Sequence, residues 1–305
     1  MTGSIVVPAI TAEPSGLALL ASKLKEAIEI IRSWKIRVPE PSRLPAAKRL
    51  LEQVAKMDSY PSDQAQLNRI ANSIRIAFDF YHITRVLPEE RIDAVVEDLR
   101  RALGGTLDDV GPSQAHRAQS QVLIAAVMAV GGLTPGAPRT DRGVTPDYVA
   151  QVGTLSFAVE IKRPESLAGL RTKIDEAIDQ VDALDTSGGA LVIDVSDCMS
   201  LDSGSELGEE ASKTDFRTLY GVVCDAVARS TRPGASKISN LFVFANLFGW
   251  RPGPPPRPHP VFLTYQEVLH SARAGLIVEA ARDVRRRIEN GFQVFGAETL
   301  EQRQV

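Results

Sequence analysis

Two carboxylates and one lysine converge in the segment 145–164 if that segment forms a β-hairpin. Gly153-Thr154 suits a two-residue turn, and the register that this turn sets places Asp147 directly opposite Glu160. Because side chains alternate between the two faces of a strand, Lys162 shares the face of Glu160. The pairing depends on an even-numbered loop. With that loop, Asp147, Glu160 and Lys162 meet at one end of a polar face.

These residue types indicate a particular chemistry. Two carboxylates that face each other across a strand pair repel each other and need a neutralising partner. Lys162 supplies one positive charge, and a divalent cation would supply more; carboxylate oxygens suit Mg²⁺ or Mn²⁺. Such a metal ion can bind a phosphate oxygen and lower the pKa of a bound water, while Lys162 orients that water or stabilises charge on phosphorus. The site is therefore of a kind that hydrolyses a phosphodiester.

The opposite face of the hairpin is wholly apolar or aromatic, which predicts that it packs on a core. Its members are Tyr148, Ala150, Val152, Leu155, Phe157, Val159 and Ile161. A simpler interpretation of the polar face is an ion-pair ladder on an exposed sheet, where such pairs contribute only about 0–1 kcal/mol. Val149 and Ala158 lie between the charged positions and argue against full exposure, so the metal site is the favoured interpretation.

The same residues resemble a known signature. Pro146-Asp147, twelve intervening residues and then Glu160-Ile161-Lys162 are similar to the motif of the PD-(D/E)xK nuclease superfamily, which has the restriction-endonuclease-like fold. The chain has no other Pro-Asp pair and no other acid-x-Lys triplet. The resemblance covers residues 113–197. It implies Mg²⁺, or Mn²⁺, bound by Asp147, Glu160 and the main-chain carbonyl of Ile161, with Lys162 assisting the attacking water.

One feature of that family is missing from this sequence. Many members carry an acidic residue on the first core helix, close to the site. Here that helix offers Gln114, Gln119 and Gln121 but no acid, and Asp108 or Asp109 just upstream is the alternative. A third carboxylate ligand is therefore left unassigned.

Other polar residues near the motif have simpler interpretations. Lys173 and Gln180 lie two turns apart on the helix after the ExK strand and can point at the site, but a solvated helix face is favoured for both. That helix also lacks the Gln and Tyr four residues apart that some family branches have. Asp194 and Asp197 end a core strand, and we expect them to cap or turn the chain, with an approach of Asp197 to the site as the alternative.

Composition limits the class of protein. The chain has 305 residues, 44% hydrophobic and 24% charged, a balance that excludes disordered, collagen-like and disulfide-stapled proteins. A net charge of −3 excludes a protein that coats nucleic acid by bulk positive charge. The densest basic stretch, Arg282 with residues 285–287, alternates with acids and is interpreted as a solvated face. Two cysteines outside any CxxC, and no apolar stretch long enough for a bilayer, predict a cytoplasmic protein.

The expected fold is α/β, with a restriction-endonuclease-like mixed sheet flanked by helices and an all-helical N-terminal region. The predicted units are the helical region 1–110, the nuclease-like core 111–265 and a C-terminal helix over 266–305. The order expected in the core is a buried helix, a strand, the PD strand, the ExK strand, a helix and a strand. The proline-rich stretch 252–260 is expected to be a stiff connector.

The favoured function is a Mg²⁺-dependent or Mn²⁺-dependent endonuclease or exonuclease. DNA is expected as the substrate rather than RNA, and a role in defence or repair follows only by analogy of fold. The alternative is a non-catalytic binding or assembly protein that retains the nuclease fold. A protein partner or a homodimer is left open, and no membrane contact is expected.

Overall fold

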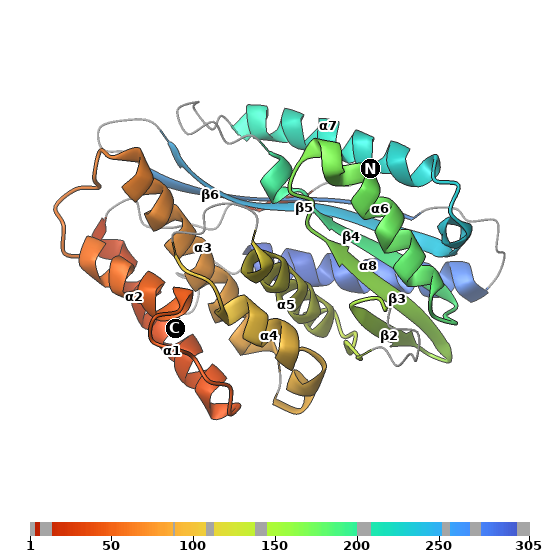
Figure 1. Ribbon diagram of the computed structural model, residues 1–305, viewed down its shortest axis with the longest axis horizontal. Helices are drawn as coiled ribbons and strands as arrows, with labels where there is room; N and C mark the ends of the chain where they lie inside the picture. Colours follow the sequence, from red (N-terminus) through yellow and green to blue (C-terminus); the bar gives the residue numbers. More distant parts are fainter. Residues whose placement is uncertain are drawn as a thin grey trace.

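The computed structural model describes residues 4–6, 14–87, 89–107, 113–137, 145–199, 209–251, 257–268 and 276–297. In this part of the chain, a six-stranded mixed sheet has the order β1-β6-β5-β4-β3-β2 (Figure 1). β3, β4 and β5 are parallel to one another, and the remaining neighbours are antiparallel. The strands are β1 Ser4–Val6, β2 Tyr148–Val152, β3 Leu155–Lys162, β4 Gly188–Asp194, β5 Ile238–Arg251 and β6 Arg257–Val268.

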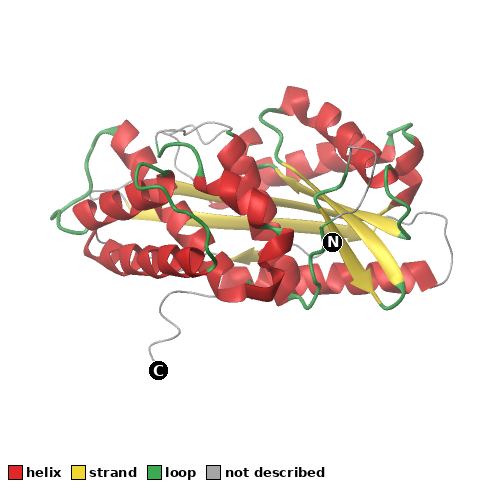
Figure 2. Ribbon diagram, turned by 60° about the horizontal axis from the view of Figure 1, so that its bottom comes forward, coloured by secondary structure: helices red, strands yellow, loops and turns green. Residues whose placement is uncertain are grey.

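Helices cover both faces of this sheet (Figure 2). One face packs on α3, α5 and α8 in a core that also contains α1, α2 and α4, while the other face packs on α6 and α7. The helices are α1 Leu17–Ser33, α2 Arg43–Val54, α3 Gln64–Val86, α4 Val96–Leu103, α5 Gln114–Val130, α6 Leu167–Asp182, α7 Glu209–Ala228 and α8 Leu276–Ala297.

The predicted α/β class is confirmed, and so are the two helices that flank the motif. Ser113 and Ser166 cap α5 and α6, each accepting a hydrogen bond from the backbone N–H three residues on. The expectation of an all-helical N-terminal region is wrong at one point, because β1 pairs with β6 at the edge of the sheet. The helices α1, α2, α3 and α4 also share one continuous apolar core with α5, β3 and α8.

The C-terminal prediction needs correction. Residues 257–260, expected to be part of a stiff connector, begin β6, and β6 continues to Val268, where a helix was expected from 266. The helix α8 starts only at Leu276. Among the described residues, Pro258 and Pro260 pair only with β5, and the described β1 reaches only as far as Phe262, a position at the sheet edge that tolerates the missing N–H groups of proline.

Two glycines allow α8 to press against α5, the helix that reaches the candidate site. A Cβ atom added to Gly131 would lie 1.9 Å from the backbone oxygen of Arg287, and one added to Gly291 would lie 2.1 Å from that of Val127. The two helix backbones therefore cross in direct contact, which holds α5 on the sheet. None of the described helices is long and apolar enough to cross a membrane.

Candidate active site

The β2–β3 hairpin has the register that the sequence predicts. Tyr148 pairs with Val159 and Val152 with Leu155, so the turn is Gly153-Thr154. Gly153 has a φ of 59°, a left-handed conformation that favours glycine. The apolar face of the hairpin lies in the core, as expected, with Tyr148 fully buried.

This register brings the predicted catalytic residues together. The backbone N–H of Asp147 donates to Glu160 Oε2 at 3.0 Å, and Lys162 Nζ lies 2.5 Å from Glu160 Oε1. Glu160 is completely buried, whereas the Lys162 side chain keeps 17% of its surface exposed. An exposed ion-pair ladder is therefore not what these residues form. The Glu160 carboxylate is shielded from solvent, and the Lys162 side chain is partly exposed.

The carboxylate of Asp147 is held from two sides. Its Oδ2 accepts the backbone N–H of Ile161 at 2.7 Å, and its Oδ1 accepts the side-chain amide of Gln121. Gln121 comes from α5, the helix on which the family pattern would place an acid. A neutral amide therefore contacts Asp147 where a third carboxylate was sought; Asp108 and Asp109 lie outside the described residues.

The proline before Asp147 has a structural consequence at Ile161. The N–H and C=O groups of one strand residue point to the same side, so the carbonyl of Ile161 faces the Pro146-Asp147 segment as its N–H does. Continued by two residues, the register places Pro146 opposite Ile161. Proline has no N–H, so it cannot donate to this carbonyl as another residue would. In this register, Pro146 therefore gives the Ile161 carbonyl no hydrogen-bond donor.

Burial dominates the electrostatics of both carboxylates. It raises the pKa of Asp147 to about 6, against the lowering effects of the Ile161 N–H and the nearby Lys162 ammonium. Burial also raises the pKa of Glu160 well above its usual range; the charge of Asp147 raises it further, and Lys162 opposes both. One ammonium therefore does not compensate two buried carboxylates, and the ionised pair requires additional positive charge.

The donor set fits a hard divalent cation. Asp147, Glu160 and the Ile161 carbonyl offer oxygen atoms at the same end of the hairpin, which is the ligand type that Mg²⁺ and Mn²⁺ prefer. No cluster of three or more Asp, Glu, His or Cys side chains suited to a metal occurs among the described residues. A metal here would therefore depend on two carboxylates, one carbonyl and added ligands such as water.

Gln180 lies at the site, where a solvated helix face was the favoured prediction. Its Oε1 accepts a hydrogen bond from Lys162 Nζ, and its Nε2 donates to the Thr145 carbonyl at 2.8 Å. The amide orientation is unambiguous, because an ammonium only donates and a carbonyl only accepts. Gln180 thus connects Lys162 to Thr145, two residues before Asp147. Lys173 on the same helix pairs instead with Glu176 at the surface, as predicted.

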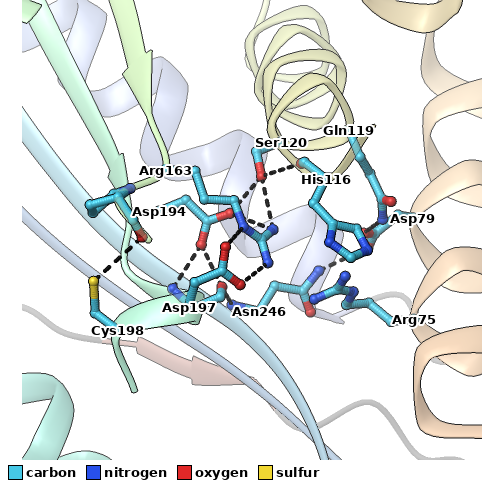
Figure 3. A network of polar contacts seen from close by, with 12 residues as sticks. Arg75, Asp79, His116, Gln119, Ser120, Arg163, Asp194, Asp197, Cys198 and Asn246 are labelled. Atoms are coloured by element: carbon cyan, nitrogen blue, oxygen red, sulfur yellow. Dashed lines mark hydrogen bonds and ion pairs between the residues drawn. The ribbon is translucent and has the colours of Figure 1, made fainter. Parts of the chain in front are cut away.

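Arg163 is a second residue that the sequence reasoning missed. It follows Lys162 directly, but its side chain enters the opposite side of the sheet, where Asp194 and Asp197 bind it (Figure 3). The alternative that Asp197 approaches the metal ligands is therefore not what the structure shows. The only sequence signal was an arginine next to the motif lysine, with two acids at the end of the next strand.

Three of the four arginines of α8 bind acids of their own helix, in agreement with a solvated face. Arg286 and Arg287 both pair with Asp283, and Arg285 pairs with Glu289.

In comparisons with known proteins, no family model, no curated protein and no solved structure matches this chain.

Proposed function

We propose that the chain is a metal-dependent nuclease that hydrolyses phosphodiester bonds of nucleic acid. The observation that carries this proposal is the cluster of Asp147, Glu160 and Lys162 on one buried hairpin, with the Ile161 carbonyl beside them. Burial raises the pKa values of both carboxylates, and the partly exposed Lys162 is the cation that contacts Glu160. Carboxylates with pKa values perturbed by burial and by a charged neighbour are concentrated at functional sites.

The order of elements around the motif supports the same proposal. A buried helix, α5, precedes an antiparallel bridge between Gly136 and Val149, and β2, β3, α6 and β4 follow in that order. β3 and β4 are parallel, as α6 between them requires. The bridge stands where the first strand of the resembled core is expected. We therefore propose a restriction-endonuclease-like arrangement for residues 113–197.

Each residue of the site has a proposed part in the reaction. Asp147, Glu160 and the Ile161 carbonyl would hold Mg²⁺ or Mn²⁺, which supplies Lewis acidity toward a phosphate oxygen and lowers the pKa of water. Lys162 would donate hydrogen bonds to the attacking water or to a phosphate oxygen as negative charge builds there. Gln180 would keep the lysine ammonium turned toward Glu160, and Gln121 would hold the Asp147 carboxylate in place.

DNA is the proposed substrate, ahead of RNA. A chain with a net charge of −3 does not bind nucleic acid by bulk attraction, so contact with phosphate would be local and metal-mediated. A protein partner or a second copy of the chain would then supply added affinity. A role in defence or repair rests on analogy of fold, and a cytoplasmic location rests on the two cysteines without CxxC spacing.

The proposal is tested with Asp147→Asn. Mn²⁺ should raise the unfolding temperature of the wild type but not that of Asp147→Asn, which removes one ligand charge and keeps the side-chain shape. Purified wild type should cleave single-stranded DNA, double-stranded DNA or RNA in Mn²⁺, and the variant should not. Glu176→Gln is the matched control, because it removes an exposed acid of α6 whose partner is Lys173.

A second candidate function is a non-catalytic binding or assembly protein that retains the fold. The observation that favours it is Gln121, a neutral residue where an acidic ligand was sought. A Mn²⁺-induced stabilisation that Asp147→Asn abolishes, together with no cleavage of any of the three nucleic acids, would support this function over the nuclease.

Gln180 should affect the rate more than binding. In Gln180→Leu, Lys162 loses its acceptor and the Thr145 carbonyl loses its donor, so the ammonium is no longer held toward Glu160. We expect kcat to fall roughly 10-fold with KM nearly unchanged, a size usual for residues that orient a metal site. Glu176→Gln on the same helix should leave kcat unchanged. Equal rates for both variants would show that Gln180 has no part in orienting Lys162.

A further inference from the structure

A second polar cluster lies on the other side of the sheet, at the carboxyl ends of β3 and β4 (Figure 3). We call it the buried network. It joins the sheet to α5 and to the N-terminal helix α3 through hydrogen bonds and ion pairs that are shielded from solvent. Its members are Asp79, Gln119, Ser120, Arg163, Asp194, Asp197 and Asn246.

Arg163 is the centre of this network. Its Nε and Nη2 donate to the two carboxylate oxygens of Asp197, each at 2.7 Å, in a bidentate pair. Its Nη1 donates to Asp194 at 3.1 Å and to the hydroxyl of Ser120 at 3.2 Å. The Arg163 side chain is only 6% exposed. A buried guanidinium with this many charged partners has one defined position, because any displacement leaves buried charges without compensation.

The network reaches the N-terminal helices through Asp79. Asp79 belongs to α3 and accepts hydrogen bonds from Gln119 of α5 and from Asn246 of β5, the latter at 2.9 Å. Ser120, next to Gln119, donates to Asp194 at 2.5 Å. Two consecutive residues of α5 therefore hold it in place: Gln119 bonds to Asp79 of α3, and Ser120 bonds to Asp194 at the end of β4.

Two pairs of adjacent residues connect the buried network to the candidate active site. Ser120 is bonded within the network, whereas Gln121 holds Asp147. Arg163 is bonded within the network, whereas Lys162 contacts Glu160 and Gln180. Adjacent Cα atoms are held about 3.8 Å apart by a planar peptide. A displacement of Arg163 or Ser120 is therefore passed directly to its neighbour in the site.

We propose that the buried network positions the candidate active site, with Arg163 setting the place of Lys162 and Ser120 setting that of Gln121. This inference rests on the proposed nuclease function and adds Arg163, Ser120, Asp194 and Asp197 as positioning residues. It also makes the N-terminal helices part of the catalytic unit. A misplacement of about 1 Å at the reacting groups can reduce a rate about 100-fold, so a small shift of the buried network would change the reaction rate.

The test uses Asp197→Asn in the full chain, with Asp182→Asn as its matched control. Asp197→Asn replaces one of the two Asp197 oxygens that accept from Arg163 with an amide NH2 group and removes the negative charge; the Asp197 side chain is 15% exposed, so no fully buried group is replaced. Asp182→Asn removes an ion pair to Lys237 of 2.8 Å near the opposite ends of the parallel strands. We expect Asp197→Asn to lower kcat in Mn²⁺ at least 10-fold with little change in KM. Asp182→Asn should stay within two-fold of the wild type.

A readout independent of activity separates positioning from general damage. With ¹³C-labelled lysine, the chain gives nine ε-carbon signals, and that of Lys162 is identified by its loss in Lys162→Arg. At one fixed pH, Asp197→Asn should shift the Lys162 signal, and Asp182→Asn should not. If the wild type cleaves no nucleic acid, the proposed function fails, whereas the Lys162 signal alone still decides whether the network positions this residue.

If Asp197→Asn does not fold, Ser120→Ala is the variant that tests whether the buried network positions the candidate active site. Alanine suits a helix interior, and the change removes only the hydroxyl between Asp194 and Arg163. We expect Mn²⁺ to bind at least three-fold more weakly, because Gln121 no longer holds Asp147 firmly. An unmoved Lys162 signal in folded Asp197→Asn, or unchanged Mn²⁺ affinity in Ser120→Ala when that variant stands in, would overturn the proposal.

Discussion

Replacement of Lys162 by methionine is expected to lower the rate of metal-dependent cleavage by roughly 10²–10⁴-fold, the size usual for the loss of a positioned proton donor or acceptor. Methionine keeps an unbranched chain of similar length but carries no charge and no hydrogen-bond donor. The ammonium lies 2.5 Å from Glu160 and also donates to Gln180, so a single substitution removes the only cation of the cluster.

The measurement is the single-turnover rate at saturating Mn²⁺. Saturation matters because the loss of the ammonium also raises the affinity of Glu160 for a proton, and the metal must compete with that proton. Lys173→Met is the matched control, since Lys173 lies on the exposed face of α6 with Glu176 as its partner. Equal cleavage by the wild type and Lys162→Met would point to a contaminating nuclease and exclude Lys162 from catalysis.

Glu160→Gln is expected to make the metal-free protein more stable while abolishing its response to metal. Glu160 is fully buried, and its raised pKa means that the folded state holds a proton more tightly than the unfolded state. The contribution of Glu160 to the free energy of unfolding is therefore greatest below the ordinary pKa of glutamate, about 4.3. This contribution decreases as the pH rises toward the pKa of Glu160 in the folded state. Glutamine removes this loss, and its single carbonyl oxygen can accept a hydrogen bond from the Asp147 N–H or from Lys162, which contact different oxygens of Glu160.

The comparison is made by chemical unfolding in EDTA at pH 8 and at pH 5. At pH 8 the variant should exceed the wild type by about 1–3 kcal/mol, the usual cost of a poorly compensated buried polar group, and at pH 5 the difference should shrink. Mn²⁺ should stabilise the wild type only. A variant that is less stable than the wild type at pH 8, or that keeps its Mn²⁺ response, would show that Glu160 is a structural ion-pair partner.

Metal binding should also weaken in acid. The pKa of Asp147 is raised to about 6, so below that pH a proton occupies the carboxylate that the cation needs. The Mn²⁺-induced stabilisation of the wild type should therefore decrease as pH falls through about 6. Asp147→Asn should show no Mn²⁺ response at either end of this range.

The hairpin and its two faces were predictable from the sequence because they follow local rules. Side-chain alternation has a period of two, so a two-residue turn at Gly153-Thr154 sets every facing pair of the hairpin. That register alone brings Asp147, Glu160 and Lys162 to one place. The caps Ser113 and Ser166 are equally local, since a capping side chain reaches only three residues along the chain.

The surroundings of the site depend on contacts between distant parts of the chain. Gln121 and Gln180 reach the motif because α5 and α6 dock on the sheet in a particular rotation, which no short sequence window specifies. Arg163 follows the motif lysine in the sequence and is the centre of a buried network, because Asp194 ends the next strand, β4, and Asp197 follows three residues later. The proline-containing residues 257–260 belong to a strand because they pair with residues 248–251 of β5.

The sequence by itself determined which groups can do chemistry and which face of the hairpin carries them. The tertiary structure decided how deeply those groups are buried, and burial is what raises the pKa values of Asp147 and Glu160. It also decided that the N-terminal helices are tied to the same sheet through Asp79. The physical reason is that side-chain order along a strand is set by bonded geometry, whereas desolvation and ion pairing are set by every element that packs around the site.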